Sequence, residues 1–212
     1  MTNYVGIERA ALAELFEQVG PDAPTLCTGW TTYDLAAHLV VRERVPAAWP
    51  GLAVPRLSGR TERVQRQFKD EHPYEECIRL VRQGPPRWLP MGAPVLGEAV
   101  NLLEFLVHHE DVRRAQPGWV PRAVPTDFAD AVWAQLRLAS RLMLRRAPVG
   151  VVLHRAGRSG EITGKRGEPV VTVSGDPVEV ALYAFNRRGV ARVEVRGDEG
   201  ARARLAAAEI GP

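Results

Sequence analysis

Polar residues recur along one face of an otherwise apolar segment between Asn101 and Arg114. Glu104, His108 and Asp111 are spaced four and three residues apart, so a helix would place them on one face. The residues around them are apolar: Leu102, Leu103, Phe105, Leu106, Val107 and Val112. Such a helix has to be buried in a core, where an ionised carboxylate is costly unless a counter-charge or a metal ion compensates it. The segment therefore predicts a buried helix that carries half of a metal site.

The length and the two cysteines narrow the class of protein. A chain of 212 residues is long enough for one large domain or two small ones. No apolar stretch is long enough to span a bilayer, and the first eight residues lack the basic and apolar regions of a signal peptide. Cys27 and Cys77 are too far apart for a CxxC motif, so a disulfide framework is not expected. We therefore expect a cytoplasmic protein without a membrane partner.

The basic residues are almost all arginines, because Lys69 and Lys165 are the only lysines. A composition rich in Arg, Ala and Val is typical of GC-rich coding, and the net charge of +3 is modest. A nucleic-acid-binding face needs clustered basic residues interleaved with aromatic ones, whereas these arginines are scattered along the chain. Nucleic acid is therefore not an expected partner.

Helical periodicity dominates the chain up to about residue 147. Thr31 and Asp34 resemble an N-capping box, and His72-Pro73 is expected to interrupt a charged helical stretch. The predicted helical segments span about residues 7–19, 31–44, 61–83, 94–115 and 126–143. This part of the sequence therefore predicts a helical bundle.

Short segments rich in β-branched residues follow, at about residues 149–154, 168–174 and 190–195, and they predict strands. Between the last two, Asp176, Pro177 and Glu179 are typical of a helix start, and Gly189 is a plausible stop. Gly197-Asp198 is expected to begin a short last helix. The sequence thus predicts a helical bundle over residues 1–147 and a small α+β domain over residues 148–212.

A second helix offers a further metal ligand. His38 shares its helical face with Leu35 and Leu39, which points it toward the interior. Together, His38, Glu104 and His108 give three ligands from two helices, the number that a catalytic zinc site usually takes from protein. These ligands would leave a divalent ion with about one net positive charge. Two simpler explanations stay open: a core histidine bonded to a carbonyl, and a Glu–His pair within one helix.

The neighbours of this ligand set have different expected roles. His109 is rotated off the polar face and is expected to face solvent or a loop. Asp111 can orient His108, accept hydrogen bonds from arginine, or bind metal itself, and we favour a supporting role without metal binding. Cys27 can be a reactive thiol or simply pack. The sequence contains no GxSxG, HExxH or GxxxxGK[ST] motif.

Two segments together resemble a known family. They are Cys27-Thr-Gly-Trp-Thr-Thr-Tyr-Asp-Leu-Ala-Ala-His38 and Glu104-Phe-Leu-Val-His-His-Glu-Asp111, the second with the pattern Glu-x-x-x-His-x-x-Asp. Both resemble the metal-binding segments of the mycothiol-dependent maleylpyruvate isomerase family, which belongs to the DinB-like bundles. The resemblance covers nearly the whole chain and implies an α-helical DinB-like four-helix bundle followed by a small sterol-carrier-like α+β domain. It also implies His38, Glu104 and His108 as the metal ligands.

The resemblance further implies cofactors and a substrate-binding residue. The family's metal is typically zinc, and its thiol cofactor, mycothiol, implies an actinobacterial cytosol. In the family isomerase, an arginine of the C-terminal domain holds an acidic substrate. The segment Leu182-Tyr-Ala-Phe-Asn-Arg-Arg188 is similar to that helix end, with Asn186 in place of a common Gly and Arg187 at the matching position. The His-His-Glu-Asp-Val-Arg-Arg variant looks like a metal-binding subgroup other than the isomerase, so activity on maleylpyruvate is not implied.

Three hypotheses about function follow. The first is a divalent-metal enzyme of the isomerase or S-transferase type, in which the metal activates a low-molecular-weight thiol for attack on a small electrophile and Arg187 neutralises a substrate carboxylate. The second is a non-enzymatic module that binds metal or a small ligand. The third is metal-assisted hydrolysis, with Glu104 or Asp111 as the base. Two His and one carboxylate also suit non-haem Fe(II), so the ligand types alone do not select zinc.

Overall fold

The chain divides into two units, Met1–Pro121 and Arg122–Pro212, in a computed structural model. The structure describes residues 2–46, 58–86, 88–89 and 94–211, without the side chains of residues 58, 60 and 94–100. Among the described helices, none is long and apolar enough to cross a membrane. A helix-rich unit followed by a small unit with a four-stranded sheet agrees with the predicted fold class at this coarse level.

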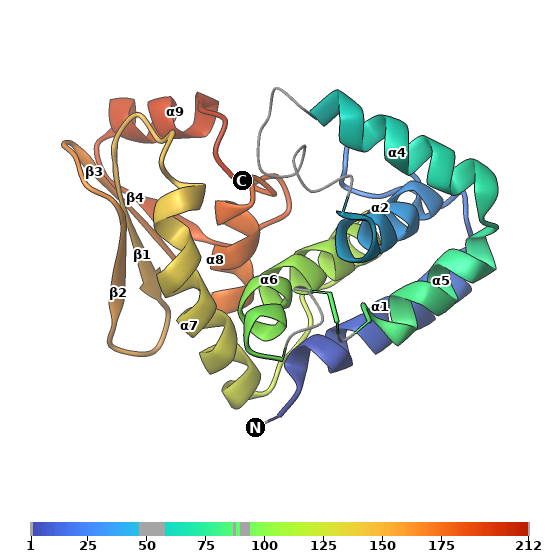
Figure 1. The fold of residues 1–212 in the computed structure, drawn as a ribbon. Coiled ribbons are helices and arrows are strands. Elements are labelled where there is room, and N and C mark those ends of the chain that lie inside the picture. Colours follow the sequence, from blue (N-terminus) through green and yellow to red (C-terminus); the bar gives the residue numbers. More distant parts are fainter. Residues whose placement is uncertain (1, 47–57, 87, 90–93, 212) are drawn as a thin grey trace. The chain divides into compact units, whose positions relative to one another are not determined.

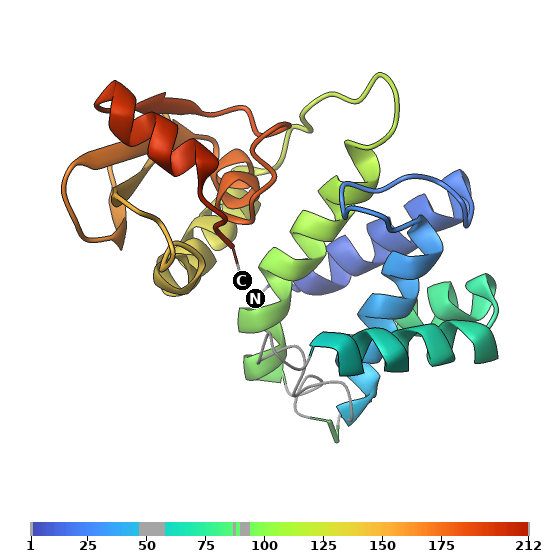
Figure 2. The ribbon, with the colours of Figure 1, turned by 90° about the horizontal axis from the view of Figure 1, so that it is seen from above.

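The first unit consists of helices that pack side by side (Figures 1 and 2). They are α1 (Tyr4–Val19), α2 (Thr32–Arg44), α4 (Ser58–Glu71), α5 (Tyr74–Gln83) and α6 (Pro94–Arg113). Helix α1 packs against α5 and α6, whereas α2 packs against α4 and α5. Their bounds lie close to those predicted from periodicity, including the break between α4 and α5 at His72-Pro73.

The start of α2 is fixed by the predicted capping box. The Asp34 backbone N–H donates to Thr31 Oγ1 at 3.4 Å, and the Thr31 N–H donates to Asp34 Oδ2 at 3.0 Å. These two bonds satisfy backbone donors that the first helical turn leaves unpaired. Leu35 and Leu39, on the face that carries His38, are fully buried. The capping box is therefore confirmed, and it fixes where the face bearing His38 begins.

Helix α6 is buried on more than one side near its C-terminal end. His108, His109, Glu110 and Asp111 are consecutive, and all four are buried. The expectation that His109 faces solvent or a loop is wrong, because its Nδ1 lies 3.0 Å from Glu8 Oε2 on α1. His109 lies one residue beyond the polar face of α6 and therefore points toward α1. The periodicity of α6 alone does not show that α1 lies there.

A buried ion pair and its contacts join α1, α2, α5 and α6. The Arg9 guanidinium donates to both carboxylate oxygens of Glu43, at 2.7 and 2.6 Å, and so links α1 to α2. It also donates to the Val81 carbonyl of α5 at 2.9 Å and lies 4.1 Å from the centroid of the Phe105 ring of α6. One side chain thus contacts three other helices. A bidentate pair with further contacts is the geometry in which buried charges are tolerated.

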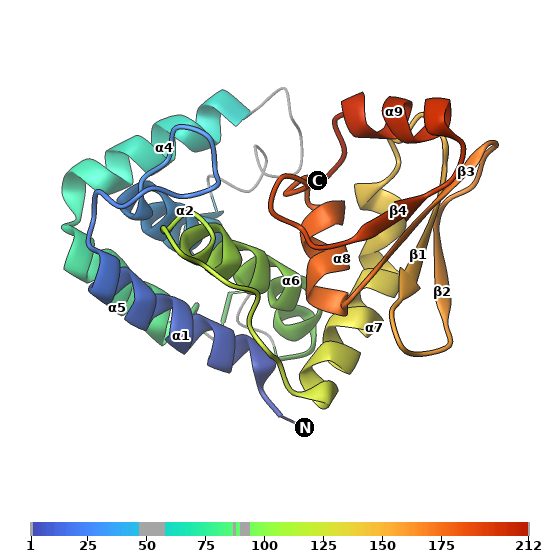
Figure 3. The same cartoon turned by 180° about the vertical axis from the view of Figure 1, so that it is seen from behind.

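The second unit contains helices α7 (Thr126–Met143), α8 (Pro177–Ala184) and α9 (Glu199–Ala207), and strands β1 (Gly150–Arg155), β2 (Glu161–Lys165), β3 (Val170–Gly175) and β4 (Glu194–Arg196). The sheet order is β2-β1-β3-β4, with β1 and β3 parallel and the outer pairs antiparallel. Figure 3 shows β4 beside β3. Alternate residues Val151, Leu153, Val171 and Val173 are fully buried, so one face of the sheet belongs to the core.

Two features of this unit differ from the expectation. Strand β2 was not predicted; its alternation of charged or polar residues with Ile162 and Gly164 is weak as a strand signal. Helix α7 packs against α8 and β2, with Phe128, Val132 and Leu136 buried. The structure therefore divides after residue 121, whereas the predicted boundary lay between 147 and 148. The apolar face of α7 predicts a helix but does not indicate which unit covers it.

The Arg9–Glu43 pair leads to a prediction about stability. Arg9→Met leaves the Glu43 carboxylate buried without its partner and is expected to lower the free energy of unfolding by about 3–5 kcal/mol. Arg9→Met combined with Glu43→Leu removes both charges and should recover most of that loss. Chemical denaturation followed by circular dichroism measures both variants. A double variant no more stable than the single one would show that the lost packing of Arg9 on Phe105, and not the stranded carboxylate, causes the effect. Arg82→Met, which breaks the exposed pair with Glu17, is the control and should change little.

Candidate metal centre

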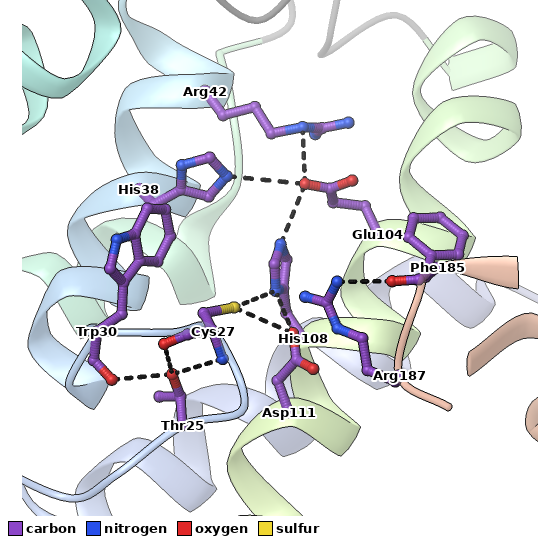
Figure 4. Close-up of polar contacts among 10 residues, drawn as sticks. All are labelled: Thr25, Cys27, Trp30, His38, Arg42, Glu104, His108, Asp111, Phe185 and Arg187. Carbon is purple, nitrogen blue, oxygen red and sulfur yellow. Dashed lines mark hydrogen bonds and ion pairs between the residues drawn. The ribbon is translucent and has the colours of Figure 1, made fainter. Parts of the chain in front are cut away.

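Three predicted ligands from two helices converge in the first unit. Glu104 Oε1 lies 3.2 Å from His108 Nε2 and 3.8 Å from His38 Nε2. The three ligand atoms all lie within 4.8 Å of one another, and Figure 4 shows the side chains pointing toward a common point. Ligands of a tetrahedral zinc site are separated by about 3.4 Å, given metal–ligand distances near 2.1 Å. These residues therefore fit a divalent metal, with small adjustments of the His38 ring.

Two aromatic rings lie beside the His38 imidazole. Its ring lies 4.9 Å, centroid to centroid, from the indole of Trp30, which precedes α2. On another side, its ring lies 5.6 Å from that of His108, at an angle of 73°. Among the described residues, its partners are these two rings and Glu104, with no bond to a backbone carbonyl. The reading of His38 as a core histidine bonded to a carbonyl is thus not the arrangement seen.

Arg42 is a part of the site that the sequence analysis missed. Its Nε lies 3.2 Å from Glu104 Oε1, and its Nη1 donates to Asn101 Oδ1 at 2.6 Å. Arg42 follows His38 by one helical turn, and Asn101 precedes Glu104 by three residues, so both lie on the faces already identified. That spacing is the signal that could have revealed them. Arg42 compensates the Glu104 carboxylate without offering a metal ligand, because a guanidinium only donates.

Asp111 lies at the other ring nitrogen of His108. Its Oδ2 is 2.9 Å from His108 Nδ1, and its side chain is fully buried. A carboxylate at one ring nitrogen fixes the orientation of an imidazole whose other nitrogen faces a metal. A supporting role for Asp111 requires such a contact, and the role itself stays a prediction. It places Asp111 away from the nitrogen that faces Glu104, so the geometry does not favour Asp111 as a base acting at that position.

Cys27 belongs to the same group of side chains. Its Sγ donates to Asp111 Oδ2 at 3.3 Å and lies 3.9 Å from His108 Nδ1 (Figure 4). Cys27 is half-buried, in the loop between α1 and α2. The spacing in the sequence gave no sign of this contact, because the loop and α6 are far apart in the chain.

The charges of the site follow from burial and from these contacts. Burial lowers the pKa of His38, so this imidazole is neutral. Burial alone would raise the pKa of Glu104, but the charge of Arg42, the hydrogen bond from His108 and the nearby His38 ring outweigh it and hold this pKa well below its ordinary value. Burial alone would lower the pKa of His108, but its hydrogen bonds to Asp111, Cys27 and Glu104 raise it well above the ordinary value. Only His108 therefore carries a proton that a metal ion would displace.

Arg187 belongs to the second unit, at the end of α8. The Arg187 N–H donates to the Leu182 carbonyl at 2.8 Å, and the Asn186 N–H donates to the Tyr183 carbonyl at 3.0 Å, which together form a Schellman motif. Asn186 has a φ of 66°, and Asn tolerates this left-handed conformation better than most residues. Asn can thus replace the expected Gly without changing the turn. The Arg187 Nη1 donates to the Phe185 carbonyl at 2.7 Å (Figure 4), and its binding of a substrate carboxylate stays a prediction.

Comparison with known proteins finds similarity at the level of structure. No protein-family model matches the chain, and no curated protein matches it. Two crystal structures do: the mycothiol-dependent maleylpyruvate isomerase, with a TM-score of 0.54, and a histidine-to-alanine mutant of that enzyme, with a TM-score of 0.56. Each is 15% identical in sequence, and the match covers 91% of this chain and 90% of that chain. The similarity shows a shared fold and so confirms the predicted structural resemblance.

The protonation of the three ligands predicts how metal binding depends on pH. The raised pKa of His108 means that its imidazole is protonated at neutral pH without metal, while His38 is neutral and Glu104 is ionised. Zinc binding at pH 7 to protein carrying Cys27→Ser, in which the neighbouring thiol cannot lose a proton, should therefore release about one proton, and the affinity should rise with pH until it passes the pKa of His108. Calorimetry in buffers of different ionisation enthalpy measures this number. Adding Asp111→Asn should lower the pKa of His108 and release fewer protons; release of none or of two by the Cys27→Ser protein would contradict this assignment.

Proposed function

We propose that this protein is a divalent-metal-dependent enzyme that uses a low-molecular-weight thiol of the mycothiol type to isomerise or S-conjugate a small electrophilic substrate. The convergence of His38, Glu104 and His108 carries the proposal. The fold shared with a mycothiol-dependent isomerase supports it. In the same proposal, α1, α2, α5 and α6 form a DinB-like four-helix bundle, and the second unit is a sterol-carrier-like domain.

The ligand set determines what chemistry is available. His38, Glu104 and His108 would hold zinc and leave one coordination position open, as catalytic zinc sites do. When bound, the metal lowers the pKa of a thiol and holds the sulfur as a nucleophilic thiolate. Asp111 orients the His108 ring, and Arg42 holds the Glu104 carboxylate in place. In this arrangement the Nε2 of His108 would face the metal, while Asp111 accepts the N–H of Nδ1.

The charge of the site favours an anionic partner. Glu104 and Asp111 contribute negative charges and Arg42 a positive one, so a divalent ion with neutral imidazoles would leave about one net positive charge. A thiolate at the open position would neutralise it. Addition of a thiolate to a conjugated alkene would give a carbanion and a rotatable single bond. Rotation followed by expulsion of the thiolate would give the isomer, whereas protonation of the carbanion would give an S-conjugate. The role of Arg187 toward a substrate carboxylate rests on the sequence resemblance.

Metal content tests the first half of the proposal. We expect tag-free protein carrying Cys27→Ser to bind about one zinc or cobalt ion per chain, because three ligands suffice for a catalytic site. The Cys27→Ser background removes the thiol beside His108 as an additional ligand. Adding His38→Gln to it should lower the affinity at least about tenfold, since a ligand contributes no less than its supporting residues do. Adding His154→Gln, in β1 of the second unit, is the matched control and should have no effect. Equal affinities of the His38 and His154 variants would refute the ligand set.

Thiol binding tests the second half. Mycothiol added to the cobalt-loaded Cys27→Ser protein should produce a sulfur-to-cobalt charge-transfer band in the near ultraviolet, whereas its S-methyl derivative should not. Cys77 does not contribute, because it is buried and burial raises its pKa to about 11. A cobalt spectrum that mycothiol leaves unchanged, in protein that binds cobalt fully, would favour hydrolysis or a non-enzymatic binding module instead.

A further inference from the structure

A second group of possible ligands lies on the other side of the His108 ring. Cys27 Sγ, His108 Nδ1 and Asp111 Oδ2 are separated by 3.9 Å (Sγ to Nδ1), 3.3 Å (Sγ to Oδ2) and 2.9 Å (Nδ1 to Oδ2). Tetrahedral zinc with one sulfur, one nitrogen and one oxygen ligand would separate these atoms by about 3.4–3.6 Å. The three atoms therefore lie near the positions that a cation would require. The three separations differ from the expected ones by about 0.3–0.5 Å, so small side-chain adjustments would bring the atoms to those positions.

A backbone hydrogen bond joins the loop that carries Cys27 to α6, and bonds within the loop hold its shape. The Leu26 N–H donates to the Asp111 carbonyl at 3.1 Å. The Cys27 N–H donates to Thr25 Oγ1 at 3.1 Å, and the Thr25 hydroxyl donates to the Trp30 carbonyl at 2.9 Å. The Trp30 N–H closes the turn on the Cys27 carbonyl at 2.9 Å. The thiol is thus held beside Asp111 by its own backbone, which reduces the entropy that a cation would otherwise have to offset.

His108 has a carboxylate at each ring nitrogen. Glu104 lies at Nε2 and Asp111 at Nδ1 (Figure 4). A neutral imidazole has one nitrogen that accepts and one that donates, so it can bind a cation through either nitrogen while the carboxylate at the other accepts its N–H. The same ring therefore serves two positions that exclude each other. Cys27 faces only the Nδ1 side, so it does not complete the first position.

We propose that Cys27, His108 and Asp111 form a second cation position, selective for thiophilic divalent ions, that competes with the first for His108. The ligand set of one sulfur, one nitrogen and one oxygen differs from the two imidazoles and one carboxylate of the first position. Thiolate ligands favour softer ions, whereas imidazole and carboxylate accept a wider range. An ion held at Nδ1 leaves His38 and Glu104 without their third ligand. An ion in the second position would therefore prevent the thiol chemistry proposed above. A regulatory role of the second position thus rests on the proposed function.

Cobalt binding without added thiol tests the second position. His38→Gln removes a ligand of the first position alone, and this variant should still bind about one cobalt ion per chain with a sulfur-to-cobalt band in the near ultraviolet. Cys27→Ser removes a ligand of the second position alone, and its cobalt should lack that band. Both changes together should lower cobalt affinity at least about tenfold relative to either variant. Cys77→Ser is the matched thiol control and should leave the spectra unchanged.

The outcomes separate this proposal from the proposed function. Wild-type protein should bind one cobalt ion in total, because the two positions share one ring; two ions would overturn the competition. A His38→Gln protein that binds no cobalt, or binds it without the sulfur band, would overturn the second position, and the Cys27→Ser protein would still report on the first. Circular dichroism checks that each variant is folded. If His38→Gln does not fold, Glu104→Gln removes a ligand of the first position from α6 and answers the same question.

Discussion

The half-buried Glu104 carboxylate, which lies on a helix surrounded by apolar core residues, is the constraint on which the candidate site depends. A carboxylate on a helix lined by leucines, valines and phenylalanine is stable only with compensation: Arg42 and the protonated His108 supply the charge, and the neutral ring of His38 lies 3.8 Å away. Two of these partners belong to α2, so the compensation also joins α2 to α6. Replacing such a network by apolar residues is often neutral or stabilising. Its presence in a core therefore favours a role in function over a role in stability alone.

The polar residues of the first unit fall into two kinds. Arg9 and Glu43 form a complete pair: two guanidinium nitrogens of Arg9 each donate a hydrogen bond to one carboxylate oxygen of Glu43, and the two charges cancel. The site around His108 is different, because it combines two carboxylates, two imidazoles and a thiol with one arginine. Such a group has more potential ligands than cations. A surplus of ligand atoms in a buried position is what a metal site requires, whereas a structural pair is balanced without any further ion.

Sequence periodicity predicted those features that depend on neighbours within one helix. Glu104 and His108 are one helical turn apart, and Thr31 and Asp34, which form the capping box, are three residues apart. The spacing of these residues in the sequence was therefore enough to predict both pairs. What failed depended on another segment. His109 was misplaced because its partner is on α1, and the contact of Cys27 with Asp111 comes from a loop 84 residues earlier in the chain. The unit that covers α7 is likewise decided by tertiary packing and not by its own apolar face.

The similarity to a known enzyme and the chemistry of this chain carry different kinds of information. A fold shared at 15% identity describes the course of the backbone alone. It does not account for what the site does, since function resides in the site and not in the fold. Here the side chains around the ligands determine the chemistry: Arg42 fixes the carboxylate at Nε2 of His108, and Asp111 with Cys27 occupies the opposite nitrogen. In the two proposals made above, the direction in which the His108 ring offers its lone pair would therefore decide which ion binds and whether an external thiol can reach it.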